Sequence, residues 1–178
     1  MKLGFTLESI GWVIAPKLNG TIRYGKKEEQ DDLFRALCGE KEDREYQPRR
    51  KHASDPKPPV EIHTLQQTMA RVCSNVKNRQ DKDVRSFMKK LEEEIEKKEL
   101  DKNSVIIIDA TDIVDKKTVT GLVANKLTEK YRRPIVILRA KDKDYYGGSG
   151  RGYDKGTIDN FNSFLEETGV FECMGHPN

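Results

Sequence analysis

The stretch that decides the fold is SVIIIDATDIVDKKTVTGLVANKLTEKYRRPIVIL, residues 104–138. Near its start, residues 105–108 form a short β-branched run that ends at Asp109. At its end, residues 135–138 form a second apolar run of similar length. Short apolar runs without polar alternation are typical of strands that are buried on both faces. The stretch therefore predicts two buried strands.

A helix is predicted between the two strands. Leu122, Val123 and Leu127 follow helical spacing, and Thr120 precedes them as a candidate N-cap. Basic residues occupy its last turn, where they suit the helix dipole, and Pro134 then ends the helix. A strand, a helix and a strand at this spacing predict a βαβ unit with two parallel strands.

The C-terminal part completes a small domain at residues 104–178. Residues 145–152 are rich in glycine, a helix is expected over about residues 157–168, and a short strand is expected at 170–174. The predicted fold class is α/β, with a small, mixed and partly parallel sheet and flanking helices. A long connector helix precedes this domain.

The chain upstream divides into three parts. Residues 64–103 have apolar positions at helical spacing on both sides of a polar stretch, so they form one long connector helix or two helices with a polar break. Residues 40–63 are charged and rich in proline, which favours a flexible linker or long surface loop. Their cluster Arg49-Arg50-Lys51 could touch a phosphate backbone, but a solvated loop is the preferred interpretation. In the N-terminal segment, residues 1–39, residues 14–25 are interpreted as a structured turn.

Composition limits the class of protein. Of 178 residues, 35% are hydrophobic and 35% are charged, so one core that fills the whole chain is not expected. The 33 basic residues nearly balance the 30 acidic ones, so an anion site must come from local clustering. No apolar stretch is long enough to span a bilayer, and no membrane partner is expected. Three cysteines without a paired motif indicate free thiols in a reducing compartment, so we expect a cytoplasmic protein.

One glycine-rich motif could bind an anion. The motif GGSGRGY occupies residues 147–153. Its glycines let a ligand approach the backbone, Ser149 adds a hydroxyl, and Arg151 adds a planar fork suited to phosphate. The alternative interpretation is a hairpin or a flexible loop.

Three other short segments are weaker candidates. His176 follows Gly175 near the C-terminus, where a turn residue is the plainer explanation. Asn19 and Arg23 are plausible polar contacts in a segment that is otherwise a surface loop. Asn78-Arg79-Gln80 lies in the polar stretch of the connector and is otherwise a solvated helix face.

The order of these motifs resembles that of a known family. Residues 121–138, 147–153 and 156–176 resemble the DHH-associated domain of RecJ-like phosphoesterases, in which an SGR loop and a GGH tail follow a helix and a strand. Residues 11–25 (GWVIAPKLNGTIRYG) resemble the segment that follows the DHH domain in RecJ. Asn78-Arg79-Gln80 falls at a related motif of that family's connector helix. The chain thus resembles the C-terminal part of a RecJ-like single-stranded-DNA-specific exonuclease.

The resemblance implies a role in holding nucleic acid. RecJ-like enzymes are metal-dependent exonucleases that degrade single-stranded DNA from the 5′ end. Their DHH-associated domain holds substrate phosphates across a cleft from a metal-binding DHH domain. By position, the substrate-binding residues here would be Ser149, Gly150, Arg151, Gly175 and His176, with Asn19, Arg23 and Arg79 lining the strand path.

The metal-binding half of such an enzyme is not found in the sequence. Hydrolysis with two metal ions needs several Asp and His ligands, whereas this chain has 3 histidines and no DHH motif. Asp109 is interpreted as the polar end of a core strand, and Met174 stands where the family has the first glycine of its tail. We therefore expect no catalytic residue and no bound cofactor here. Mn²⁺ or Mg²⁺ is expected in a DHH domain of the same or a companion polypeptide.

Three hypotheses follow. The first is the single-stranded DNA-binding half of a RecJ-like 5′–3′ exonuclease of DNA repair or recombination, inactive by itself, with DNA or RNA as its ligand. The second is a fragment of a DHH-family phosphoesterase that acts on short oligonucleotides or cyclic dinucleotides. The third is a non-catalytic interaction module.

Overall fold

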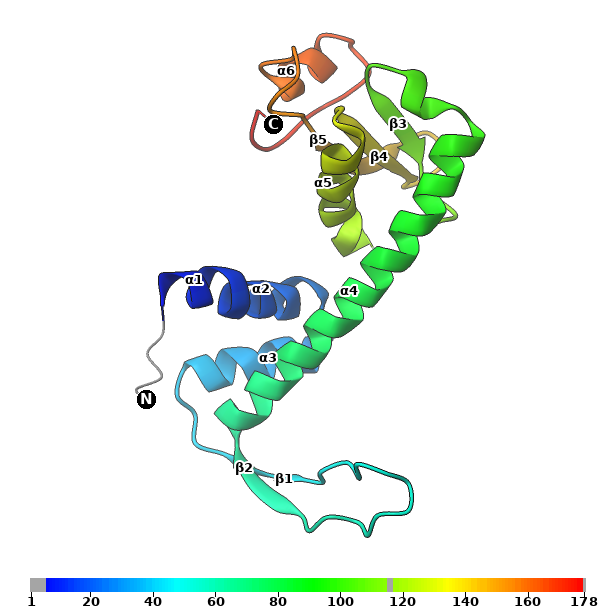
Figure 1. Cartoon of the computed structure of the whole chain (residues 1–178). Helices are drawn as coiled ribbons and strands as arrows, with labels where there is room; N and C mark the ends of the chain where they lie inside the picture. Colours follow the sequence, from blue (N-terminus) through cyan, green and yellow to red (C-terminus); the bar gives the residue numbers. More distant parts are fainter. Residues whose placement is uncertain (1–5, 115–116, 178) are drawn as a thin grey trace. The chain divides into compact units, whose positions relative to one another are not determined.

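The structure, a computed structural model, describes residues 6–114 and 117–177 (Figure 1). The chain divides into two compact units, an N-terminal unit (Met1–Asp81) and a C-terminal unit (Lys82–Asn178). Within the described residues, no helix is long and apolar enough to cross a membrane.

One continuous helix, α4 (Leu65–Lys97), belongs to both units. The polar stretch at its middle stays helical, because Val76, Gln80 and Val84 continue the buried stripe at steps of four residues. The ion pair between Lys77 and Asp81 supports the exposed side of the same turn. Of the two alternatives left open by the sequence, the structure therefore has the single helix.

The N-terminal unit packs short helices on the first half of α4. Its core contains Leu33, Leu65, Met69 and Cys73, all of which are buried. An antiparallel pair of strands leads from the short helices into α4. The elements are α1 (Leu7–Ser9), a π-turn η1 (Ile10–Ile14), α2 (Ala15–Tyr24), α3 (Lys27–Leu37), β1 (Asp43–Tyr46) and β2 (Glu61–Thr64).

The expected turn at residues 14–25 is wrong, because most of this segment is the helix α2. Pro16 lies in the first turn of α2, where the missing backbone N–H costs no hydrogen bond. Gly20 lies where α2 approaches α4, since a Cβ atom added to it would be 3.4 Å from the Lys77 side chain. Pro16, which suggests a turn in the sequence, lies at the start of a helix, and Gly20 lies where that helix contacts α4.

The C-terminal unit is a three-stranded sheet with helices, which confirms the predicted α/β class. The strand order is β3-β4-β5; β3 and β4 are parallel, and β5 is antiparallel to β4. The parallel pair joined by a helix is the βαβ unit expected from the sequence. The elements after α4 are η2 (Leu100–Lys102), β3 (Ile106–Asp109), η3 (Lys117–Val119), α5 (Thr120–Tyr131), β4 (Ile135–Ala140), β5 (Tyr146–Arg151) and α6 (Phe161–Glu166).

Helices α5 and α6 pack on opposite faces of this sheet, since Val136 packs with Phe161 of α6 while Ser149 bonds Thr120 of α5. Side chains alternate between the faces of a strand, so neighbouring residues of β5 meet different helices. Gly150 faces α6, since a Cβ atom there would be 3.4 Å from the Phe161 ring. Ser149 and Arg151 face the first turn of α5 instead. The pleat of β5 thus decides which helix each residue of the SGR motif meets.

The glycine-rich segment is the strand β5 and not a loop. All six of its residues pair with β4, from Tyr146 opposite Ala140 to Arg151 opposite Ile135. A Cβ atom on Gly148 would lie only 2.0 Å from the Ile137 carbonyl oxygen, so glycine is required there for the two strands to approach.

Three smaller expectations also need correction. Residues 170–174 form no strand; the Cys173 N–H donates instead to the Glu166 carboxylate at 3.3 Å. Helix α6 is shorter than expected because Asn160 caps it, accepting a hydrogen bond from the Ser163 N–H. Thr120 is not the cap of α5, because its hydroxyl bonds Ser149.

Candidate functional site

The end of β5 and the first turn of α5 form one polar cluster, defined by Thr120, Gly121, Ser149 and Arg151. The hydroxyls of Thr120 and Ser149 lie 2.8 Å apart and share a hydrogen bond. A Cβ atom on Gly121 would lie 3.0 Å from Nη2 of Arg151, so the guanidinium rests against the helix backbone where only glycine leaves room. We call this the Arg151 cluster.

The charge of Arg151 is not neutralised by a neighbour. Its Nη1 donates to the carbonyl oxygen of Gly150 at 2.6 Å, and no carboxylate within the described ranges pairs with it. The N-terminal end of α5 adds a partial positive charge and backbone N–H groups to the same place. A half-buried guanidinium, a helix N-terminus and two hydroxyls together favour a phosphate or carboxylate ligand.

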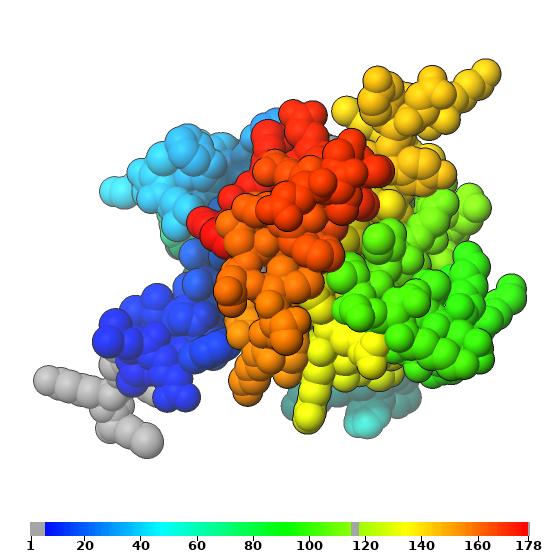
Figure 2. Space-filling model, turned by 90° about the horizontal axis from the view of Figure 1, so that it is seen from above, coloured from blue at the N-terminus to red at the C-terminus, as the bar shows by residue number. Residues whose placement is uncertain are grey.

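The C-terminal tail reaches this region through α6. The backbone N–H of Phe161 donates to the Pro177 carbonyl oxygen at 2.7 Å, and the Phe161 ring covers Gly150. Figure 2 shows the tail in red lying against α6 in orange. His176 is exposed, and Gly175 has a φ of +132°, a conformation that favours glycine. Phe161 therefore connects the strand that holds Ser149 with the segment that holds His176.

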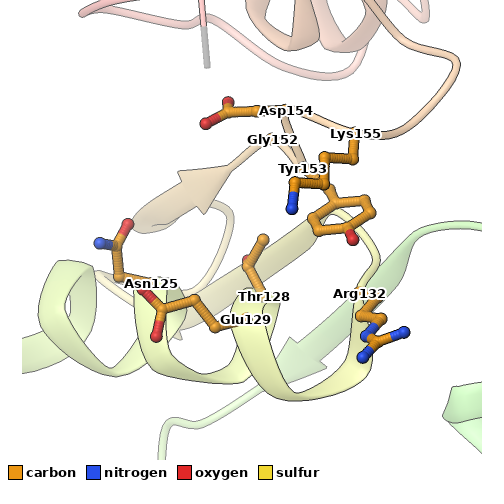
Figure 3. Close-up of a pocket in the computed structure, with 8 residues that line it drawn as sticks. All are labelled: Asn125, Thr128, Glu129, Arg132, Gly152, Tyr153, Asp154 and Lys155. Carbon is orange, nitrogen blue, oxygen red and sulfur yellow. The ribbon is translucent and has the colours of Figure 1, made fainter.

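A shallow polar pocket of about 500 Å³ continues along α5 beyond Arg151 (Figure 3). One wall comes from α5 and the other from the segment that directly follows Arg151. The ring of Tyr153 is the aromatic surface in this pocket, and amide, carboxylate and cationic groups surround it. The lining residues are Asn125, Thr128, Glu129, Arg132, Gly152, Tyr153, Asp154 and Lys155.

The three connector-side candidates belong to the N-terminal unit, and the other five belong to the C-terminal unit. Asn19 and Arg23 are exposed and four residues apart on α2, so they share one face of that helix. Gly20 beside them packs on Gln80 of the Asn78-Arg79-Gln80 segment, which brings these two sequence motifs together. Their role in binding stays a prediction.

Arg79 has a structural partner. Its Nη2 donates to both carboxylate oxygens of Glu29, at 2.9 and 2.7 Å. Burial alone would raise the pKa of Glu29, but the hydrogen bonds and charge of Arg79 outweigh it, so the pKa lies below its ordinary value. The positive charge of Arg79 is thus largely engaged in holding α3 on α4.

Asp109 acts as the polar end of its strand. Its carboxylate accepts hydrogen bonds from the backbone N–H and hydroxyl of Thr111, which lower its pKa below the ordinary value. Tyr146 adds a weak contact at 3.5 Å. Across residues 6–114 and 117–177, no group of three or more His, Cys, Asp or Glu side chains could hold a metal ion.

Sequence reasoning missed three members of the site. Thr120 is predicted as a helix cap, Gly121 is not singled out, and Tyr153 falls within the GGSGRGY motif without a role of its own. A signal existed for Gly121, since glycine at the start of a helix that follows a buried strand often marks a close ligand or side-chain approach. No signal in sequence reports that Thr120 and Ser149, which lie far apart in the chain, touch.

The chain is similar over nearly its whole length to two curated proteins. A comparison with protein-family models finds no match. The chain is 36% identical over 177 residues to a Bacillus subtilis (strain 168) protein that carries the provisional name SPbeta prophage-derived single-strand DNA-specific exonuclease YorK. The corresponding protein of Bacillus phage SPbeta has the same identity. The alignment covers 97% of this chain and 30% of each relative, so the chain spans about a third of the length of the curated relatives it matches.

Proposed function

We propose that this chain is the part of a RecJ-like exonuclease that holds single-stranded DNA by its phosphates. The observation that carries the proposal is Arg151, a half-buried arginine against the start of α5 without a carboxylate partner in the described ranges. A cation in this position gains much from a bound anion, because a single carbonyl oxygen compensates only part of its desolvation. The names of the relatives, which specify single-strand DNA, support single-stranded DNA as the anion in this proposal.

The pocket beside the cluster suits the base of the nucleotide whose phosphate lies at Arg151. Gly152 and Tyr153 follow Arg151 directly, so phosphate and base sites are adjacent along the backbone. An aromatic ring gives a stacking surface that every base can use, which matches binding without sequence preference. Gly175 and His176 would close the site from the tail, and Asn19 and Arg23 would guide the strand farther away. Arg79 would contact the strand only by exchanging its bond to Glu29 for a phosphate.

The proposal assigns hydrolysis to another part of the enzyme. Metal ions would supply an activated water and stabilise charge on the phosphate. Their ligands would come from a DHH domain on the same or a companion polypeptide, since the described residues here do not provide them. With Mn²⁺ and 5′-labelled single-stranded DNA, this chain alone is expected to release no nucleotide. Robust degradation that Arg151→Ala abolishes would contradict this assignment.

Binding is the direct test. Affinity for a labelled oligo(dT) would be measured by fluorescence anisotropy at several salt concentrations for the wild-type chain and Arg151→Met. Loss of a charge-assisted bidentate contact is expected to weaken binding about tenfold or more. Arg151→Lys, which keeps the charge without the planar fork, should restore part of the affinity. Lys143→Met, an exposed cation in the same unit, is the matched control and should bind like wild type. Equal affinity of Arg151→Met and wild type at low salt would overturn the proposal.

A second function is favoured by the size of the pocket. A volume of about 500 Å³ is large enough for a single nucleotide, which suits a phosphoesterase that acts on short oligonucleotides or cyclic dinucleotides. Competition separates the two functions. A mononucleotide that displaces oligo(dT) at a similar concentration supports the small substrate, whereas weak displacement supports the long strand.

A further inference from the structure

The loop between β1 and β2, residues 47–60, holds a concentrated positive charge. It contains Arg49, Arg50, Lys51 and Lys57 against the single carboxylate of Asp55, a net charge of +3. The whole chain also has a net charge of +3, so the rest of the protein is neutral overall. The loop extends from the end of the strand pair in Figure 1, and its charged side chains are exposed or half-buried.

The base of this hairpin is firmly held on the N-terminal unit. Arg44 of β1 donates to Asp32 of α3 at 2.9 Å and also pairs with Glu42. The guanidinium carbon of Arg71 lies 3.3 Å from the centre of the Tyr46 ring, a cation–π contact between α4 and β1. The base of the hairpin is therefore anchored on the unit, and residues 47–60 project from it as a surface loop.

The loop itself is braced without using its cations. The Gln47 side chain donates to the Pro58 carbonyl oxygen at 2.8 Å and closes the loop at its neck. At the tip, the carboxylate of Asp55 accepts a hydrogen bond from the backbone N–H of His52 at 2.9 Å. Four prolines limit the backbone further. The brace uses an amide, backbone groups and the loop's single carboxylate.

The cations at the tip differ from the arginine at the base in their partners. Arg44 is fully engaged by carboxylates. Arg49, Lys51 and Lys57 have no ion pair or hydrogen bond within the part of the chain that the structure describes, and Arg50 contacts only the Ala53 carbonyl oxygen. Like charges held close together repel one another, and a fold gains nothing by bracing them unless an anion binds.

We propose that residues 47–60 are a basic arm that binds the phosphate backbone of a nucleic-acid strand. The inference rests on the proposed function for the nature of the ligand, but uses none of the residues of the Arg151 cluster. The arm contains no Phe, Tyr or Trp, and its exposed aromatic ring and exposed large apolar side chain are those of His52 and Val60, so we expect it to contact mainly phosphates. The arm extends the stretch of nucleic acid that the protein contacts, and it does not select a base sequence.

The test removes three charges from the arm. The variant Arg49→Gln/Arg50→Gln/Lys51→Gln is compared with Lys82→Gln/Lys89→Gln/Lys90→Gln, which removes three exposed charges from α4. The probes are oligo(dT) of about 40 nucleotides and a DNA hairpin duplex, each titrated at several salt concentrations. Circular dichroism checks that both variants keep their helix content.

The arm variant is expected to bind oligo(dT) about tenfold more weakly, and the slope of log K against log salt should fall by about 2, because each lost phosphate contact lowers it by about 0.7 for single strands. The α4 variant should change affinity less than about twofold. Equal losses in both variants, or an unchanged slope in the arm variant, would overturn the inference. The probe that loses more affinity identifies the strand that the arm contacts, single-stranded or duplex.

The same assay separates this inference from the proposed function. If the arm variant loses affinity and Arg151→Met does not, the result supports DNA binding by the basic arm and contradicts DNA binding by the Arg151 cluster. If Arg151→Met alone loses affinity, the result supports DNA binding by the Arg151 cluster, and the arm is a solvated loop.

Discussion

Several arginines of the N-terminal unit differ from Arg151 of the C-terminal unit in the partners that their guanidinium groups contact. In the N-terminal unit, Arg35, Arg44 and Arg79 are each held by one or more carboxylates. In the C-terminal unit, the Arg151 guanidinium donates to a carbonyl oxygen of its own strand and lies against the start of α5, and no carboxylate among residues 6–114 and 117–177 pairs with it. Arg35, Arg44 and Arg79 therefore serve as structural clamps, whereas Arg151 is a candidate ligand site. The number of arginines alone says nothing about where an anion binds; the decisive fact is whether a carboxylate already occupies the guanidinium.

The units also differ in what stabilises them. The C-terminal unit has a sheet whose inward residues, Ile106, Ile108, Ile135 and Ile137, are almost fully buried. The N-terminal unit has a smaller core and leaves Trp12, Phe34 and Leu37 exposed. Charge pairs around α3 and β1 supplement that small core. We therefore expect the C-terminal unit to respond most to lost apolar volume and the N-terminal unit to respond to pH and salt.

The largest expected effect is in the sheet. Ile108→Ala should lower the free energy of unfolding of the C-terminal unit by about 2–5 kcal/mol, because it leaves a cavity in the core. Ile107→Ala is the matched control on the same strand: this side chain is 42% exposed, so its loss should cost less than about 1 kcal/mol. Urea unfolding with hydrogen exchange read separately in each unit gives both values. Equal losses would show that the unit is not organised around this face of the sheet.

A smaller effect is expected from acid. Hydrogen bonds from Arg44 hold the pKa of Asp32 and of Glu42 below their ordinary values of 3.8 and 4.5. Because these pKa values are depressed in the folded state, their stabilisation is complete above the unfolded values and is lost as the pH falls below about 4. Hydrogen exchange of α3 and β1 should therefore accelerate in this range before that of the sheet.

Arg44→Met tests the cause of that acid response. Removal of the guanidinium should flatten the pH dependence of the N-terminal unit and cost about 1 kcal/mol at neutral pH. Asp31→Asn is the control, since the pair of Asp31 with Lys27 is far more exposed. An acid response that persists unchanged in Arg44→Met would show that other groups govern it.

The smallest effects come from two glycines in helices. In Gly20→Ala, the added Cβ atom has room, at 3.4 Å from the Lys77 side chain, so the substitution should stabilise α2 by about 0.5–1 kcal/mol.

Gly121→Ala would place its Cβ 3.0 Å from Nη2 of Arg151 and push the guanidinium aside, which should weaken DNA binding about two- to fivefold without unfolding. Gly147→Ala, which meets nothing within 4 Å, is the control in the same region. Thermal unfolding and anisotropy measure the two quantities, and unchanged affinity in Gly121→Ala would place the ligand elsewhere.

Local sequence patterns determined a large part of this protein. The strand, helix and strand at residues 104–138 and the helical character of residues 64–103 could be predicted because apolar spacing and a terminal proline act within one element; that α4 is one unbroken helix was decided by the structure. The SGR motif was singled out for the same reason, since Arg151 and its flanking glycines are neighbours in the chain. The three free cysteines also agree with the sequence.

Only the tertiary structure decided the rest. The glycines at 147, 148 and 150 suggest a loop when the sequence is read alone. The reason for glycine at Gly148 is the close carbonyl oxygen of Ile137 on the partner strand β4, which the local sequence does not reveal. Helix α2 forms where proline and glycine suggest a turn, because Gly20 packs on α4. Whether an arginine is engaged, as Arg79 is by Glu29, or available, as Arg151 is, depends on residues far away in the chain. Contacts of this kind arise when elements pack together, and no local pattern of residues encodes them.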